Sequence, residues 1–265
     1  MNKIIGLLVL AFIFSFMTDA FSESADLSPE EKGYAIAQEM DRRDSGFHDS
    51  EEVFIMKIVD NRGNELIRRM RMRVLEQQKD GDWSMSIFDE PADVKGMALL
   101  TYTHGLDPDD QWLYMPALKR VKRIASNKKS GAFMGSEFSF EDFSANDLRK
   151  YQFKYLRDES FNGKKCTVSE WIPLYKHSGY TRMLVWIDDL YRVQKIDYYN
   201  RQDKLLKTLL YQNYQQFLEK YWRPMQLDMV NHMDKKRTVL VYESYKFKTG
   251  LTERDFDQNA LKRAR

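Results

Sequence analysis

An alternation of apolar and polar residues, repeated over most of the 265 positions, constrains the fold of this chain more than any other feature. Met70 and Met72, for example, alternate with Arg69, Arg71 and Arg73. Successive side chains of a β-strand point to opposite faces, so such a segment has one apolar and one charged face. The pattern predicts strands that bury one face in a core and expose the other to water.

Turn residues divide the alternating segments into hairpins. Asp80-Gly81 and Asn162-Gly163 favour tight turns, and Asp234 to Lys236 form another tip. We count about ten or eleven strands at hairpin spacing, with no strand–helix alternation and no internal repeat. The chain is therefore predicted to be mainly β, with a single antiparallel sheet. So many consecutive strands must curl into a barrel, a partial barrel or a sandwich.

One helix precedes the strands. Ser28 is a good N-cap, Pro29 suits the first helical position, and Glu31 completes a capping box. Tyr34 and Met40 follow at helical spacing. The helix is short and amphipathic, so we expect it to lie on the sheet.

Residues 1–22 have the features of a secretory signal peptide. Lys3 supplies a positive start, Ile4 to Met17 form an apolar run, and small residues follow at Ala20 and Ser22. A membrane anchor is the alternative, but the run is shorter than the roughly 20 residues that span a bilayer. We expect cleavage after Ala20 or Ser22.

The mature chain is then one domain, residues 23–265, which we expect to be exported, soluble, monomeric and without a permanent membrane anchor. No cysteine directly follows the apolar run, so we expect no lipobox. The only cysteine, Cys166, cannot form an internal disulfide, and it is predicted to be a buried thiol.

The central stretch from Lys119 to Phe143 departs from the alternation. It begins with a basic run and continues as a Gly-bearing segment that does not suit a regular strand or a buried helix. Five large apolar side chains in this segment argue against disorder, so the segment must cover something apolar. These side chains are Phe133, Met134, Phe138, Phe140 and Phe143.

The residues offer little for catalysis or for a metal. The four histidines are not at metal-ligand spacing from one another, and the acidic loop beside His104 is typical of a solvated turn. The pair Asp188-Asp189 is adjacent in the chain, so in an extended segment the two side chains diverge. We predict no enzyme activity, no metal and no cofactor. A hydrolase is a third alternative and would need carboxylates that converge from distant strands.

The basic run from Lys119 to Arg123 raises the question of nucleic acid. A net charge of +2 gives no strong attraction to nucleic acid, and an exported protein does not meet it. We therefore expect no nucleic-acid partner. Contact with an anionic head group or with an acidic partner remains an alternative to a plain solvated strand face.

A curved sheet with one Met- and aromatic-rich face, covered only by one helix and the central stretch, would leave an apolar cavity. Methionine adapts to ligands of different shape, so the cavity would suit acyl chains. The rival interpretation is that the covers fill this face completely. By alternation, the predicted lining residues are Met70, Met72, Trp83, Met85, Trp112 and Tyr114. The predicted cover residues are Tyr34, Met40, Phe133, Met134, Gly135 and Phe138.

Two motifs of the central region carry a family resemblance. The run from Leu113 to Ile124 (LYMPALKRVKRI), followed by Phe133 to Asp142 (FMGSEFSFED), resembles the signature of the outer-membrane lipoprotein-sorting-like proteins. These are LolA/LolB-like periplasmic proteins, and relatives are often encoded beside RND-type exporters. The resemblance implies an open, incomplete barrel over an N-terminal helix and a central insert, with a hydrophobic cavity. The sorting carrier has an arginine that locks its lid, and the resemblance does not place this arginine at any single position of the present chain.

From the residues and the resemblance together, we expect a periplasmic, non-enzymatic carrier or chaperone. It would bind lipid or lipoprotein acyl chains and help to deliver them toward the outer membrane. The helix and the central stretch would move aside to admit them. The alternative is an interaction module, a periplasmic accessory of an RND-type inner-membrane exporter.

Overall fold

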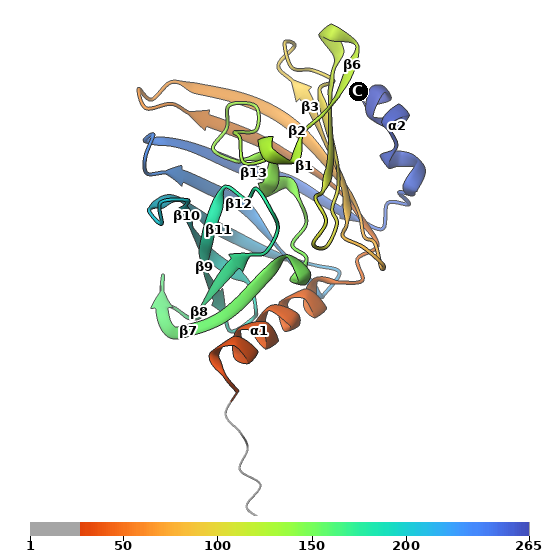
Figure 1. Cartoon of the computed structure of the whole chain (residues 1–265). Helices are drawn as coiled ribbons and strands as arrows, with labels where there is room; N and C mark the ends of the chain where they lie inside the picture. The colour runs from red at the N-terminus through yellow and green to blue at the C-terminus, as the bar shows by residue number, and fades with distance from the viewer. Residues whose placement is uncertain (1–26, 265) are drawn as a thin grey trace, which may run out of the picture.

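Thirteen strands form one antiparallel sheet in the computed structural model, which describes residues 27–264 (Figure 1). The strand order is β6-β5-β4-β3-β2-β1-β13-β12-β11-β10-β9-β8-β7. The strands are β1 (Asp49–Val59), β2 (Glu65–Leu75), β3 (Trp83–Glu90), β4 (Ala98–Tyr102), β5 (Asp110–Met115), β6 (Arg120–Arg123), β7 (Tyr151–Phe161), β8 (Lys164–Pro173), β9 (Tyr180–Asp188), β10 (Val193–Asn200), β11 (Leu205–Phe217), β12 (Tyr221–Asn231) and β13 (Lys236–Phe247).

The predicted fold class is confirmed. The chain is mainly β, and its strands form one antiparallel sheet. The sheet is open, because its end strands β6 and β7 do not pair with each other. The expected count of ten or eleven strands was too low, because short strands such as the four-residue β6 and the five-residue β4 form separate members. The basic run lies on β6, at an edge of the sheet, where Arg120, Lys122 and Arg123 are exposed.

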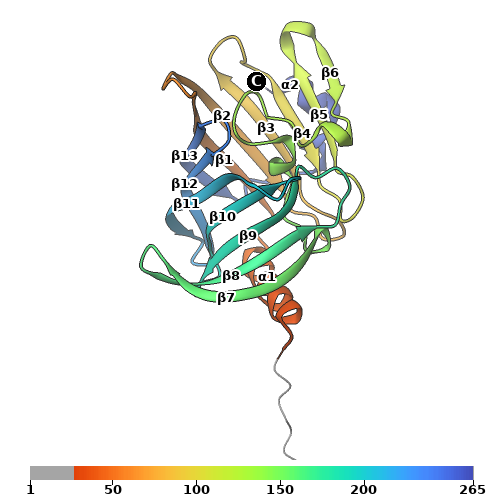
Figure 2. The same ribbon diagram turned by 60° about the vertical axis from the view of Figure 1, so that its left-hand side comes forward.

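The sheet consists of two meanders that meet at its centre. Strands β1 to β6 form the first and β7 to β13 the second, and the two are joined where β1 pairs with β13. The chain passes from the edge strand β6 to the opposite edge strand β7 through residues 124–150, here called the insert. The insert contains short 3₁₀ helices, including Phe140–Phe143, and the sheet curves around it (Figures 1 and 2).

Helix α1 (Pro29–Asp44) has the predicted capping box, with the Ser28 hydroxyl accepting from the backbone N–H of Glu31. It packs on the edge strand β7 at close range. A Cβ atom added at Gly33 would lie 2.7 Å from the backbone nitrogens of Lys154 and Tyr155. No other residue would allow this approach without displacing the helix.

A second cover lies at the C-terminus. The 3₁₀ helix Glu253–Phe256, with Thr252 as its N-cap, is followed by α2 (Gln258–Arg263). Residues 251–264, here called the C-terminal cover, lie against β3, β4 and β5 on the face opposite the insert (Figure 1). Between residues 27 and 264, no helix combines the length and the apolar character that crossing a membrane requires. The predicted signal peptide lies outside the described residues. Residues 27–264 form one continuous sheet with its covers.

Candidate functional site: the inner face and its cover

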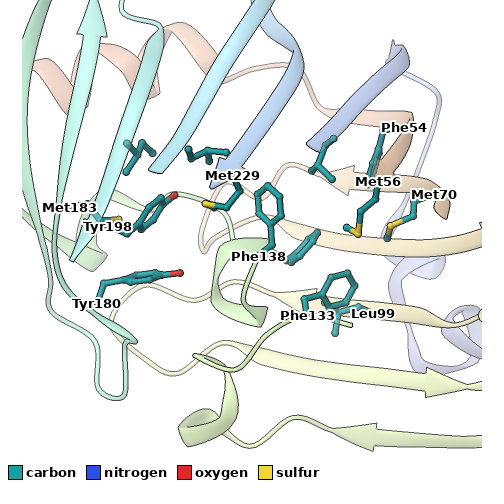
Figure 3. Packing of buried hydrophobic residues seen from close by; sticks show 14 of the residues in the cluster. Phe54, Met56, Met70, Leu99, Phe133, Phe138, Tyr180, Met183, Tyr198 and Met229 are labelled. Atoms are coloured by element: carbon teal, nitrogen blue, oxygen red, sulfur yellow. The ribbon is translucent and has the colours of Figure 1, made fainter. Parts of the chain in front are cut away.

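The face of the sheet that holds the insert, here called the inner face, is built from alternate residues of both meanders. Met56 and Met70 come from the first meander, and Tyr198 and Met229 from the second. Phe138 of the insert lies between these two sets in Figure 3. The alternation seen in the sequence thus produces a large apolar surface that faces the insert rather than water.

Aromatic side chains of the insert fill much of the space above this surface. Phe133 is fully buried, and Phe138 and Phe143 are nearly so. The ring centroids of Phe133 and Phe143 are 4.3 Å apart, and Phe133 lies 5.7 Å from Phe88 of β3. Burying each such ring is worth roughly 1.5–3 kcal/mol, so these three residues hold the insert in place.

A tight turn in the insert places these rings. Met134 has φ 53° and Gly135 has φ 78°, and a Cβ at Gly135 would meet no atom within 4 Å. The glycine is therefore needed for its left-handed backbone rather than for space.

Polar contacts between the sheet and the backbone of the insert add a second kind of attachment. Arg68 Nη1 on β2 donates to the carbonyl of Met134 at 2.6 Å. Lys207 Nζ on β11 donates to the Glu137 carbonyl at 3.0 Å and to Asp142 Oδ2 at 2.8 Å. Since Arg68 and Lys207 lie on different meanders, their contacts tie the insert to both halves of the sheet.

Glu141 anchors the far side of the insert. Its carboxylate accepts from the hydroxyls of Tyr175 (3.1 Å) and Ser178 (3.0 Å) and from the backbone N–H of Gly179 (2.9 Å). Burial raises the pKa of this carboxyl, and the charge of Asp142 adds to the effect. A Cβ at Gly179 would lie 2.8 Å from Glu141 Oε1, so this position has room for glycine alone.

The insert does not fill the inner face completely. A cavity of about 150 Å³ remains between the insert and strands β1, β2, β3, β12 and β13. An apolar cavity of this volume holds a molecule about the size of benzene, and ligand pockets usually exceed 300 Å³. Its lining residues are Phe54, Met72, Val74, Asp82, Ser84, Phe138, Asp142, Phe143, Ser144, Ala145, Leu227, Leu240 and Tyr242.

One wall of the cavity carries ionisable groups. Burial, together with the charges of Glu76, Asp44 and Asp41, raises the pKa of Asp82 to about 6. Outside the cavity lining, Glu52 lies on β1 directly opposite Met72, and burial raises its pKa to about 7. A smaller pocket of about 30 Å³ beside the paired Lys150 and Asp109 has room for a water molecule or two.

The six residues predicted to line the cavity do not share one face. Met70 and Met72 lie on the inner face, and Met72 borders the cavity. The other four pack on the outer face with the C-terminal cover: Trp83, Met85, Trp112 and Tyr114.

The strand register is the reason for this correction. Met85 pairs with Arg73 and Ser86 pairs with Met72, so Met85 points away from Met72. The expectation of a shared face was therefore wrong by one residue of register, and a one-residue slip moves a whole strand to the other face. The ligand-binding role of Met70 and Met72 stays a prediction.

The predicted cover residues of the insert lie together, whereas those of α1 are peripheral. Phe133 and Phe138 are buried on the inner face, and Met134 packs against them. Met40 also contacts the inner cluster, but Tyr34 is 47% exposed, with its ring 6.1 Å from Phe153 of β7. Helix α1 therefore closes an edge of the sheet more than it covers the inner face.

Sequence reasoning missed Arg68, although a signal was present. Arg68 has the same parity as Met70 and Met72, whereas Arg69, Arg71 and Arg73 lie on the opposite face. A cation in phase with the apolar residues of a strand indicates a buried charge with a partner. The partner, a backbone carbonyl of the insert, is distant in sequence and could not be predicted.

A family model that is described only as an uncharacterized protein family matches residues 80–263. No curated protein shows a significant match. A candidate outer membrane lipoprotein-sorting protein domain from Vibrio parahaemolyticus is 49% identical, with a TM-score of 0.86, over 88% of this chain and 99% of that one.

Two further structures extend the comparison. A DUF1329 family protein from Desulfovibrio piger is 29% identical, with a TM-score of 0.85, over 89% of this chain and 100% of that one. A LolA superfamily protein from Nitrosomonas europaea is 22% identical, with a TM-score of 0.70, over 86% and 98% of the two chains, which indicates a shared fold. The chain belongs to the outer membrane lipoprotein-sorting family, and its fold is that of the LolA superfamily.

Proposed function

We propose that this protein is a periplasmic, non-enzymatic carrier or chaperone for acyl chains of lipids or lipoproteins, which it helps to deliver toward the outer membrane. The chains would lie between the inner face and the insert. One observation carries the proposal: the inner face is incompletely filled, and its cover is one short segment, attached by three buried rings and by hydrogen bonds to its backbone.

In this mechanism the insert is a cover that the ligand displaces. The cavity of about 150 Å³ is too small for a long chain, so binding requires the insert to lift. Lifting exposes the rings of Phe133, Phe138 and Phe143, at a cost of roughly 5–9 kcal/mol. The contacts of Arg68 and Lys207 must also be broken. In this proposal Arg68 holds the insert closed until the ligand displaces it.

The hydrophobic gain of the ligand sets a chain-length requirement. Each buried CH₂ contributes about 0.8 kcal/mol, so about ten buried methylenes offset the exposure of the three rings. Ligands with long acyl chains should therefore bind, and chains well below ten carbons should not. This expectation distinguishes a carrier from a pocket that takes any small apolar molecule.

The test is a lipid extraction of protein purified from the periplasm, followed by mass spectrometry. The native protein should carry long-chain lipid, and Met72→Asp should carry much less, because a carboxylate on the cavity wall disfavours hydrocarbon. Met233→Asp is the matched control, since Met233 is 54% exposed in the turn after β12. Equal lipid content in Met72→Asp and the native protein would contradict the carrier function.

The same pair of variants bears on the exporter-accessory alternative, which rests on the resemblance alone. A carrier that also contacts an exporter would lose lipid in Met72→Asp and still co-purify with that partner. An accessory with a purely structural pocket would carry no lipid in any variant.

A further inference from the structure

Arg68 is a buried cation with an incomplete set of hydrogen-bond partners. It is 8% exposed on the inner face of β2, and its one hydrogen bond among the described residues is to the carbonyl of Met134 at 2.6 Å. Its Nε atom is buried and has no acceptor within residues 27–264. A guanidinium carries five N–H donors, and the described residues give a side-chain acceptor or carbonyl to only one of its three nitrogens.

No carboxylate neutralises Arg68 at close range in the described part of the chain. The charge of Asp93, an exposed residue in the turn between β3 and β4, acts on it only from a distance. The ring of Phe88 lies 5.6 Å from the guanidinium carbon. Burial lowers the pKa of Arg68, but arginine stays protonated in proteins. A buried, unneutralised cation is costly unless it serves a purpose in another state.

The other cation that holds the insert is different. Lys207 is also buried, but its ammonium group pairs with Asp142 at 2.8 Å in addition to the Glu137 carbonyl. Lys207 is thus neutralised in the closed state, whereas Arg68 meets only a neutral carbonyl. The two attachments would therefore respond differently to a ligand that brings a negative charge.

The position of Arg68 on β2 relates it to the cavity. Arg68, Met70, Met72 and Val74 share the inner face, and the cavity borders Met72 and Val74. Met134, the partner of Arg68, directly follows the buried Phe133. Lifting this segment would free Arg68 and extend the cavity to it. The extended site would run from Arg68 to Val74, a length of about 20 Å at about 3.4 Å per residue.

We propose that Arg68 binds the acidic head group of the acyl ligand, a carboxylate or a phosphate, in place of the Met134 carbonyl. The proposal rests on the proposed function and adds the class of ligand to it. The guanidinium fork offers Nε and an Nη to two oxygens of one anion, and the hydrocarbon tail runs along Met70 and Met72 toward Val74. The ligand thus supplies the negative charge that the closed state lacks.

The experiment compares ligands that differ only in the head group. Binding of hexadecanoate, hexadecanol and palmitoyl lysophosphatidate is measured by displacement of a fluorescent fatty alcohol from the full mature protein. The native protein should bind at least one of the two anionic ligands about tenfold more tightly than hexadecanol, as expected for a charged hydrogen-bonded pair. The two anionic ligands then distinguish a carboxylate head group from a phosphate.

The variants distinguish head-group binding by Arg68 from its hydrogen bond that holds the insert closed. Arg68→Met should bind hexadecanol at least as tightly as the native protein, because the cover is released, and should lose the preference for anions. Arg68→Lys should keep part of the preference, since it keeps the charge and loses the fork. Lys122→Met, which removes an exposed cation of β6, should behave like the native protein.

The outcomes distinguish the two proposals. If the native protein binds hexadecanol and the anionic ligands equally, the head-group anchor is wrong, and the carrier function stands. An anionic preference that persists in Arg68→Met would also overturn the anchor. If none of the three ligands binds, the carrier function itself fails. Should Arg68→Met not fold, the head-group comparison in the native protein and in Arg68→Lys still decides.

Discussion

The first meander has a cover on each face, and the two covers differ in kind. On the outer face, Phe256 and Leu261 of the C-terminal cover are fully buried against Met85 and Leu100. On the inner face, the insert leaves a cavity of about 150 Å³, and hydrogen bonds to its backbone add to the packing of its buried rings. A completely packed cover is a fixed part of the core. A cover with a void beneath it and polar attachments can exchange with a ligand.

The largest expected effect separates the two covers by stability. Phe256→Ala should lower the free energy of unfolding by about 3–5 kcal/mol, as for a large buried aromatic, without changing the lipid bound per folded molecule. Phe138→Ala should also destabilise the protein but should increase lipid uptake, because it enlarges the cavity. Chemical denaturation and lipid extraction measure the two effects. Increased lipid uptake in Phe256→Ala would contradict the idea that the C-terminal cover is fixed and only the insert exchanges with a ligand.

The next effect concerns the hydrogen bond between Arg68 and the insert. Arg68→Leu removes a charged hydrogen bond to the insert, so amide hydrogen exchange in residues 131–143 should become roughly 10- to 100-fold faster. Exchange in the C-terminal cover should stay unchanged. The matched control is Arg69→Leu, which removes an exposed pair with Glu243 and should affect neither segment. Equal acceleration in both covers would mean that Arg68 supports the whole fold and not the insert.

Glu52 allows a test by pH, because it lies on the inner face opposite Met72. Burial raises its pKa from 4.5 to about 7 in the folded protein, so the folded state holds a proton that the unfolded state has lost. Its contribution therefore lowers the free energy of unfolding as pH rises from about 4.5 through about 7. Glu52→Gln should stabilise the protein by about 1–3 kcal/mol at pH 8 and have little effect at pH 4.

Denaturation curves at pH 4, 6 and 8 would measure this dependence. Glu65→Gln is the control, since Glu65 is an exposed carboxylate at the start of β2. A Glu52→Gln variant with the same pH dependence as the native protein would show that the carboxyl of Glu52 is hydrated, and that the inner face admits water in the closed state.

The smallest effect compares two glycines with the same backbone conformation. Gly135 in the insert has φ 78° and Gly63 in the turn before β2 has φ 85°, and neither has an atom within 4 Å of an added Cβ. Each change to alanine should cost about 1 kcal/mol from backbone strain alone. Only Gly135→Ala should speed hydrogen exchange in the insert, roughly fivefold. Equal exchange in the two variants would exclude a local role for the Gly135 turn.

Much of the fold could be predicted because its signals are local. Ser28, Pro29 and Glu31 predicted the start of α1, where the structure has the capping box. The alternation in β2 predicted one apolar face. These signals depend on neighbours within a few residues, so they survive without knowledge of the tertiary structure.

The site could be predicted only in part. The apolar segment around Phe133 and Phe138 was correctly expected to lie on an apolar surface, because its side chains could not remain in water. The face assigned to Met85 was wrong, because the alternation within β3 does not reveal which of its two faces joins that of β2. Bulky apolar residues occupy both faces of this strand, so hydrophobicity could not decide between them.

The sequence by itself determined the types of element but not their arrangement: a mainly β chain of hairpins with an N-terminal helix and an apolar central cover. Only the tertiary structure decided that the first and last strands pair, that the insert therefore crosses the inner face from edge to edge, and that Arg68 meets Met134 there. The physical reason is that strand periodicity is encoded in neighbouring residues. Pairing partners, register and the size of the remaining cavity depend instead on how distant segments pack together.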